Sequence, residues 1–320
     1  MRVQPTVVWI CTFGMTVLAS GSVLGQEKYP SKIIRIVTAA SGGGSDVLSR
    51  LVAPGLAENM GQQVIVDNRG AIAPEIASRA APDGYTVLFS GSPLWLLPLL
   101  RKNIPWNATR DFAPITLAVS SPSVLVVHPS VPVKTVAQLI ALAKAKPGSL
   151  NYAAGTIGAT PHLAAELFKV MAGVNVVRVP YKGSGPGLIG LMIGEVEFMF
   201  PGAASAMTYV QAGKLRALAV CSAEPSRLIP GMPTMAASGL PGYESISPQG
   251  VLAPAGTPAV LVDRLNREIV RTLNRREVRE RLHSSGIEVV GSSPQEFASK
   301  MKVDIARTNK LIKDAHIPVQ

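Results

Sequence analysis

The stretch Ile36-Val37-Thr38-Ala39-Ala40-Ser41-Gly42-Gly43-Gly44-Ser45-Asp46 decides the fold, because it turns a strand into a helix through three glycines. Its β-branched start predicts a strand over 33–38, and the pattern from Ser45 to Met60 predicts a helix. Glycines let backbone N–H groups approach a ligand, and the start of a helix carries partial positive charge. We therefore expect an anion site at Ser41–Ser45. Asp46 is expected to cap the helix and not to contact the anion, which its own charge would repel. The alternative to an anion site is a flexible connector capped by Ser45 or Asp46.

A second junction of this kind follows a predicted strand over 150–153. Its loop is Gly155-Thr156-Ile157-Gly158-Ala159-Thr160, and Pro161 then suits the first turn of a helix. The threonine hydroxyls and the N–H groups of 158–160 can point at a carboxylate. His162 is a candidate ligand or base, although a lone histidine in a first turn is more often structural. A third, weaker junction runs from a strand over 198–200 through Pro201-Gly202 into a helix of small residues.

Short β-rich runs alternate with helical patterns along the chain, which predicts an α/β fold with largely parallel sheets. Proline-rich punctuation at 128–132 and a break at Gly250 indicate that the chain leaves a first lobe and later returns to it. Two such crossings make a hinge between discontinuous lobes. We expect lobe I to comprise 26–128 and 250–320, and lobe II to comprise 129–249.

The N-terminal segment predicts export. Arg2 precedes an uncharged run over 7–24, and small residues come before the polar residues that start at Gln26, as in a secretory signal peptide over 1–25. The alternative is a retained membrane anchor, which the Ser- and Gly-rich end of the run disfavours. Without this segment Cys221 is the only cysteine, so an intramolecular disulfide is excluded and Cys221 is expected in the core.

The charge balance is basic, with a formal net charge of +11 that falls to +10 once Arg2 is removed. Such an excess suits nucleic acid, an anionic surface or an anionic ligand. Export argues against nucleic acid. The densest basic stretch, 264–281, alternates with leucines at helical spacing and lacks aromatic residues for base stacking. It therefore predicts a solvated helix face.

Motifs for catalysis or metal binding are missing from the sequence. There is no Walker A loop and no nucleophile elbow, and no two of the four histidines lie at metal-ligand spacing. The Gly185–Gly190 match to a dinucleotide fingerprint has Pro186 in its turn and lacks the acidic residue that holds a ribose. We expect no cofactor, no metal and no catalytic residue. A serine hydrolase using Ser41, Ser45 or Ser184 is a distant alternative.

Ordered blocks over nearly the whole chain after the signal segment are similar to one known family. They include Tyr29-Pro30-Ser31-Lys32, Gly43-Gly44-Ser45-Asp46, Val66-Asp67-Asn68-Arg69, Asp111-Phe112-Ala113-Pro114, Leu150-Asn151-Tyr152-Ala153 and Val179-Pro180-Tyr181-Lys182-Gly183-Ser184. In this order they resemble the Bug-type substrate-binding proteins of tripartite tricarboxylate transporters.

The resemblance implies a periplasmic, two-lobed α/β fold of the type II binding-protein kind, with a hinge of two crossing segments. It implies a monomeric receptor, not an enzyme, that closes on a small carboxylate and delivers it to membrane permease subunits. A sensor that reports a solute to a membrane kinase is the alternative, because its pocket would look the same. The sequence does not name the solute.

The candidate ligand-binding residues combine the three junctions: Ser41, Gly42, Gly43, Gly44, Ser45, Asp46, Gly155, Thr156, Ile157, Gly158, Ala159, Thr160, His162, Pro201 and Gly202. Four departures from the family pattern lie near the expected cleft. Thr38-Ala39-Ala40 replaces a usual Pro-Phe lead-in, the segment over 70–76 is shorter, Pro201 stands at a common Asp, and Pro248-Gln249 stands at a common aromatic.

Overall fold

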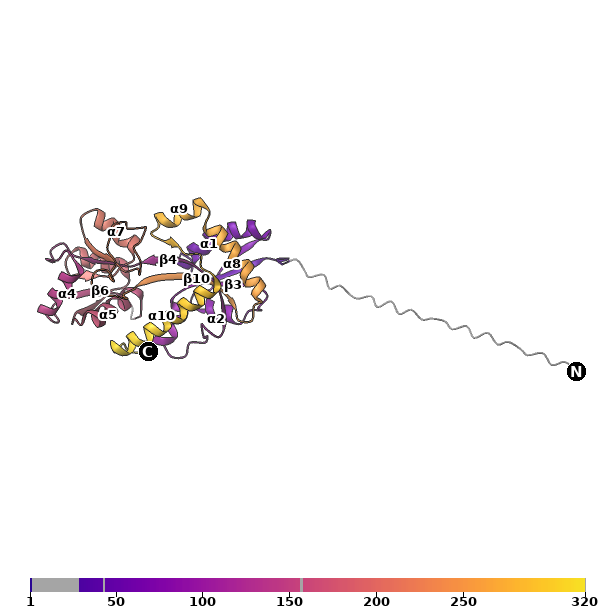
Figure 1. Ribbon diagram of the computed structural model, residues 1–320, viewed down its shortest axis with the longest axis horizontal. Helices are drawn as coiled ribbons and strands as arrows, with labels where there is room; N and C mark the ends of the chain where they lie inside the picture. The colour runs from indigo at the N-terminus through magenta and orange to yellow at the C-terminus, as the bar shows by residue number, and fades with distance from the viewer. Residues whose placement is uncertain (2–28, 43, 156–157, 320) are drawn as a thin grey trace.

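The computed structural model describes residues 1, 29–42, 44–155 and 158–319. These residues form two α/β lobes that lie side by side (Figure 1). This arrangement confirms the predicted α/β fold with two lobes and a hinge. The sheets are mixed and not largely parallel as predicted, because the strands beside the crossings between the lobes pair antiparallel with their neighbours. Apart from Met1, the predicted signal peptide lies outside the described residues. Among the helices of the described ranges, none is long and apolar enough to cross a membrane.

Lobe I is built on a six-stranded sheet with the order β11-β4-β10-β3-β1-β2. Its strands are β1 (Ile34–Thr38), β2 (Val64–Asn68), β3 (Thr86–Gly91), β4 (Phe112–Pro122), β10 (Ile246–Pro254) and β11 (Glu288–Val289). Its helices are α1 (Gly44–Met60), η1 (Gly70–Ile72), α2 (Ala73–Ser78), α3 (Pro93–Leu100), α8 (Ala259–Leu273), α9 (Arg276–Ser284) and α10 (Pro294–Asp314).

Lobe II has a five-stranded sheet with the order β7-β6-β8-β5-β9. Its strands are β5 (Val124–Val127), β6 (Asn151–Ala154), β7 (Val177–Pro180), β8 (Phe198–Met199) and β9 (Arg216–Val220). Its helices are α4 (Val136–Ala145), α5 (Thr160–Ala172), α6 (Ser184–Met192) and α7 (Ala203–Gln211). Thr135 caps α4, since its hydroxyl oxygen accepts a hydrogen bond of 3.2 Å from the Gln138 amide.

The parallel strands of lobe I bring two strand-to-helix junctions to one edge. β1 pairs in parallel with both β2 and β3. The carboxyl ends of parallel strands lie at the same edge of a sheet, so the loop from β1 to α1 and the loop from β3 to α3 are neighbours there. Buried Thr38 at the end of β1 strengthens this edge by donating a hydrogen bond of 3.1 Å to the Phe89 carbonyl of β3.

Two crossing segments connect the lobes. The chain passes from β4 to β5 through Ser123 and returns through Ser245 into β10, and the Ser123 amide donates to the Ser245 carbonyl over 3.2 Å. The sequence placed these crossings after 128 and after 249. The sheets place them earlier, because the apolar run of β5 pairs with β8 and β9 in lobe II and Ile246 already pairs with Pro122 in lobe I.

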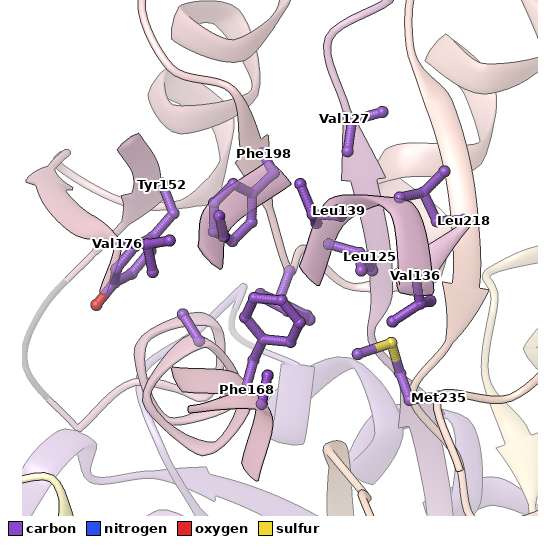
Figure 2. Close-up of a cluster of buried hydrophobic side chains, with 14 of the residues drawn as sticks. Leu125, Val127, Val136, Leu139, Tyr152, Phe168, Val176, Phe198, Leu218 and Met235 are labelled. Atoms are coloured by element: carbon purple, nitrogen blue, oxygen red, sulfur yellow. The ribbon is translucent and has the colours of Figure 1, made fainter. Parts of the chain in front are cut away.

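An aromatic cluster fills the core of lobe II (Figure 2). Phe168 of α5 lies 5.9 Å from Phe198 of β8 between ring centroids, and Tyr152 of β6 lies 5.8 Å from the same Phe198. All three side chains are fully buried, and burial of each ring stabilises the lobe by roughly 1.5–3 kcal/mol. Cys221 is buried in this cluster as predicted. The core thus provides a rigid support for the loop that follows β6.

The basic stretch forms α8 and α9, with Leu265, Ile269 and Leu273 buried while Arg267 and Arg271 are exposed. This confirms the predicted solvated face. After α9 and β11, the last helix α10 packs on β4 and α3 of lobe I and reaches α5 of lobe II (Figure 1). The C-terminal segment therefore touches both lobes.

Candidate functional site

The loop after β1 presents backbone to solvent. Ser41, Gly42 and Gly44 are exposed, and Ser45 is half-buried in the first turn of α1. Gly42 adopts a left-handed φ of 79°, which a side chain would disfavour. The first N–H groups of a helix have no partner within the helix, so this loop offers donors together with the positive end of the α1 dipole. Gly43 lies outside the described residues.

Asp46 holds this loop in shape. Its Oδ2 accepts a hydrogen bond of 2.8 Å from the Gly42 amide, and its Oδ1 accepts one of 2.9 Å from Nδ2 of Asn68. Arg50 adds an ion pair of 2.9 Å between Nε and Oδ1. The Gly42 bond is the largest of the causes that lower the pKa of Asp46. Both carboxylate oxygens are thus engaged by groups of the protein.

Gln249 joins the loop to β10, the strand that follows the return crossing. The Ser45 hydroxyl donates a hydrogen bond of 2.8 Å to Oε1 of Gln249 on β10. A methyl group placed on Gly44 would lie 3.0 Å from Nε2 of the same side chain, so the amide packs directly against the start of α1. The sequence marked Gln249 only as a departure from the family pattern. No local pattern indicates a contact with a residue 204 positions away.

A cavity of about 330 Å³ opens beside this loop in lobe I. Gly44, Ser45 and Gln249 form part of its wall, and Ser90 and Ser247 add two hydroxyls. The remaining wall is made of apolar side chains and backbone, among them Ala71, Pro74, Leu94, Leu97 and Trp106. The candidate residues Gly44 and Ser45 therefore line a space large enough for a small solute.

The junction from β3 to α3 is a part of the site that sequence reasoning missed. Ser90, Gly91 and Pro93 line the lobe I cavity, and Ser92 donates its amide to the Pro248 carbonyl over 3.2 Å. The available signal was the β-rich run over 86–90, which Gly91, Ser92 and a proline suited to a first turn follow. This is the pattern used for the other junctions. This junction connects the cavity to the crossing strand β10.

The second predicted loop enters α5, with Gly158 at a left-handed φ of 85°. His162 is 5% exposed, and its Nδ1 accepts a hydrogen bond of 3.2 Å from the Gly158 amide. Burial lowers the pKa of His162, which favours the neutral ring that this bond requires. His162 therefore shapes the loop from within. Thr156 and Ile157 lie outside the described residues.

A second cavity of about 230 Å³ lies between this loop and α3. Gly158, Ala159 and Thr160 line it from lobe II, and Leu100 and Arg101 line it from lobe I. A methyl group on Gly158 would lie 2.5 Å from Cδ1 of Leu100, so the lobes make a close contact here. Pro93 and Leu97 belong to the walls of both cavities. The described parts of the two predicted loops thus face neighbouring cavities that adjoin along α3.

The third junction lies elsewhere. Buried Pro201 accepts a hydrogen bond of 2.9 Å from the Val124 amide, and Gly202 forms a bridge with Ser123 of the hinge. Gly286 of lobe I packs against Ala204 at the start of α7. Neither Pro201 nor Gly202 is among the residues that line the two cavities. Gly155 packs near Gly183 within lobe II.

The serine-hydrolase alternative needs a serine bonded to a histidine. Ser45 bonds Gln249, and His162 bonds the Gly158 amide. Among the described residues, no hydrogen bond joins Ser41, Ser45 or Ser184 to a histidine, and no group of three His, Cys, Asp or Glu side chains is placed to hold a metal ion. The arrangement offers hydrogen-bond donors and a cavity.

Known proteins share this architecture. A family model described as the tripartite tricarboxylate transporter family receptor matches residues 48–317. The chain is 36% identical over 292 residues to the protein in the tcbD-tcbE intergenic region of Pseudomonas sp. (strain P51), covering 89% of this chain and 87% of that protein. It is 32% identical over 314 residues to BugT of Bordetella pertussis, covering 96% and 95%.

Solved structures agree with these relatives. The R. palustris protein Rpa4515 with adipate has 35% identity and a TM-score of 0.74, over 91% of this chain and 99% of that one. MatC from Rhodopseudomonas palustris with bound malate has 27% identity and a TM-score of 0.69, over 89% and 100%. A ligand-free TctC solute-binding protein from Polaromonas has 27% identity and a TM-score of 0.82, over 89% and 99%.

Proposed function

Because the chain belongs to the receptor family of tripartite tricarboxylate transporters, we propose that it is an exported periplasmic receptor that captures a small carboxylate-bearing solute between its lobes. The observation that carries this proposal is the exposed backbone of Ser41, Gly42 and Gly44 before and at the start of α1, with a 330 Å³ cavity beside it. The captured solute is then delivered to the membrane permease subunits of such a transporter.

Lobe I supplies the first half of the grip. The amides at the start of α1 and the helix dipole attract a carboxylate, and the Ser45 hydroxyl and the Gln249 amide lie beside them. The negative charge of Asp46 is offset by Arg50 and by two hydrogen bonds, so it fixes the loop without presenting a free carboxylate to the ligand. The loop is thus organised before the solute arrives.

Lobe II supplies the second half. The amides of Ala159 and Thr160 at the start of α5 lie across α3 from the first loop, whereas the Gly158 amide is bonded to His162. Closure of the lobes places a second positive helix end near the anion and shields it from water, which strengthens both interactions. A carboxylate that neither lobe binds well alone therefore favours the closed state.

The relatives support the class of solute and the location. Adipate and malate are bound in two of the similar structures, and BugD, another similar structure, is described as a periplasmic binding protein. The signal-peptide pattern over 1–25 is consistent with the same compartment. The family description supplies the transporter as the partner. The role is capture and release of an unchanged solute by a monomer.

A thermal-shift screen of the chain from Gln26 onward tests this proposal. Organic acids at a hundred times their Kd should add about 2.7 kcal/mol to the free energy of unfolding. A neutral sugar at the same concentration is the control. Stabilisation by the sugar with none by any organic acid would overturn the proposed carboxylate grip.

A further inference from the structure

The walls of the lobe I cavity indicate which carboxylate fits. We infer that the solute is a monocarboxylate with one apolar body about the size of an aromatic ring, in preference to a short dicarboxylate or a tricarboxylate. This inference rests on the proposed function, because it takes the loop at Ser41–Ser45 as the carboxylate grip. The inference adds the chemical nature of the part of the solute that lies beyond its carboxylate.

The cavity has no charged wall. Of the 17 described residues that line it, none is Asp, Glu, Lys, Arg or His. A carboxylate buried without a charged or hydrogen-bonding partner costs several kcal/mol. The cavity therefore accepts one carboxylate at its polar wall and disfavours a second one against its apolar wall.

Most of the polar and apolar side chains on the cavity wall come from different elements. β3 contributes to both, since Leu88 and Phe89 line the cavity beside Ser90. Hydroxyl and amide side chains come from α1, β3 and β10, namely Ser45, Ser90, Ser247 and Gln249. Carbon-rich side chains come from α2, α3 and the segment after α3, including Pro74, Leu94, Leu97 and Trp106. A solute with a single charged end and a single apolar end matches this division.

Trp106 presents carbon to the cavity. Its Nε1 donates a hydrogen bond of 3.0 Å to the Leu94 carbonyl, and the side chain is 9% exposed. The one polar atom of the indole is thus used by the backbone, which leaves the ring for contact with an apolar ligand. Aromatic ligands gain about 0.5–1.5 kcal/mol from such ring contacts beyond the burial of area.

The neighbouring cavity does not provide a partner for the second carboxylate of a short dicarboxylate. Arg101 is the one cation among the described residues that line the two cavities. It follows α3, whereas Pro93, which borders the lobe I cavity, begins that helix. The helical rise separates these ends by roughly 12 Å. A short dicarboxylate with its first carboxylate at the start of α1 therefore meets no cation for its second carboxylate among the described residues that line the lobe I cavity.

Isothermal titration calorimetry of the chain from Gln26 onward tests the inference with benzoate, phenylacetate, succinate and citrate. We expect benzoate or phenylacetate to bind at least tenfold more tightly than succinate and citrate. Leu97→Arg, on the wall shared by both cavities, should weaken binding of the aromatic acid at least tenfold. Ile72→Arg is the matched control, since Ile72 is 55% exposed and does not line the cavity, and it should bind as the wild type does.

The outcomes separate the two levels of the account. Succinate or citrate binding as tightly as the aromatic acids overturns the inferred class and leaves the proposed function standing. A chain that binds none of the four acids and no other organic acid overturns the proposed function itself. If Leu97→Arg does not fold, the same titration is carried out on Ala71→Phe, because Ala71 is exposed and lines the cavity. The phenyl group of Ala71→Phe should exclude the aromatic ring of the ligand from the cavity. Unchanged affinity for the aromatic acid would contradict the inference.

Discussion

Ser45 and Gln249 are joined by a hydrogen bond of 2.8 Å that ties the start of α1 to the crossing strand β10. One residue belongs to the proposed carboxylate grip and the other to the segment that returns from lobe II. The contact places a neutral amide where a carboxylate would approach. It also connects the strand that follows the return crossing to the proposed binding loop.

Replacing Gln249 with Glu should weaken binding of the carboxylate ligand. Glu has the same shape and still accepts the Ser45 hydrogen bond, but it adds a negative charge beside the bound carboxylate. Repulsion at this distance should weaken affinity roughly tenfold or more. Gln138→Glu is the control, because Gln138 is exposed on α4 and its Oε1 also accepts a hydrogen bond, from Lys134. Calorimetry should show a loss for Gln249→Glu alone, and equal affinities for both variants would argue against the grip.

Asp46→Asn should remove contacts that hold the proposed binding loop before α1 in its conformation. An amide keeps one acceptor oxygen, so the hydrogen bonds from Gly42 and Asn68 can no longer both be made, and the ion pair with Arg50 is lost. We expect weaker ligand binding and a lower melting temperature than in the wild type. Asp314→Asn removes an exposed ion pair with Lys310 and should leave both quantities unchanged.

The same residue predicts a pH dependence. The pKa of Asp46 is lowered in the folded protein, chiefly by the Gly42 hydrogen bond. Its stabilising contribution is therefore complete above the unfolded value near 3.9 and is lost as the pH falls through the lower folded value. The melting temperature of Asp46→Asn should differ most from the wild type above pH 5, and the difference should shrink towards pH 2. A difference that grows on acidification would contradict this role.

Gly158→Ala should damage the second loop. The substitution places a side chain at a left-handed φ and against Cδ1 of Leu100. Strain and overpacking together should cost about 2–4 kcal/mol of unfolding free energy. Gly173→Ala is matched for φ, at 60°, but meets open space, so it should cost only the strain of about 1 kcal/mol. Urea unfolding measures both, and the Leu100→Ala change should recover part of the loss at 158.

Glu244→Gln should weaken the link between α10 and the segment that leads into β10. Lys300 Nζ and Arg307 Nη1 lie 2.8 and 2.9 Å from Oε2 of Glu244. Burial raises the pKa of Glu244, but these two partners offset it, and the pKa is lowered overall. We expect the substitution to cost about 1–2 kcal/mol of unfolding free energy at pH 7. The loss should diminish below about pH 4, where the unfolded carboxyl takes up its proton first.

The local parts of this structure could be predicted from the sequence. The junction from β1 to α1 and the junction from β6 to α5 each combine a β-rich run, glycines and a helical pattern within a few residues. The helix α3 was missed because Leu94–Leu100 contains no polar side chain and has a proline, Pro98, inside it. No amphipathic period therefore marks a helix there. The early crossing at Ser123 was missed because the prolines at 129 and 132 mark the stronger break in the sequence, whereas the pairing of β5 with β8 and β9 is not local.

The roles of single side chains depended on contacts that sequence patterns do not contain. Asp46 was expected near the helix start, but its bond to Asn68 requires β2 beside α1. His162 and Gly158 are four residues apart, yet only the fold shows that the ring is buried and turned toward the loop. Whether the candidate residues bind the solute stays a prediction.

A crystal structure of the chain from Gln26 onward, with the organic acid that stabilises it most, tests the central claim most directly. The account predicts a carboxylate oxygen within about 3 Å of the Gly44 or Ser45 amide or the Ser45 hydroxyl, at hydrogen-bond distance. It also predicts that the remainder of the solute lies against Leu97 and Trp106. A carboxylate bound away from the start of α1 would contradict it.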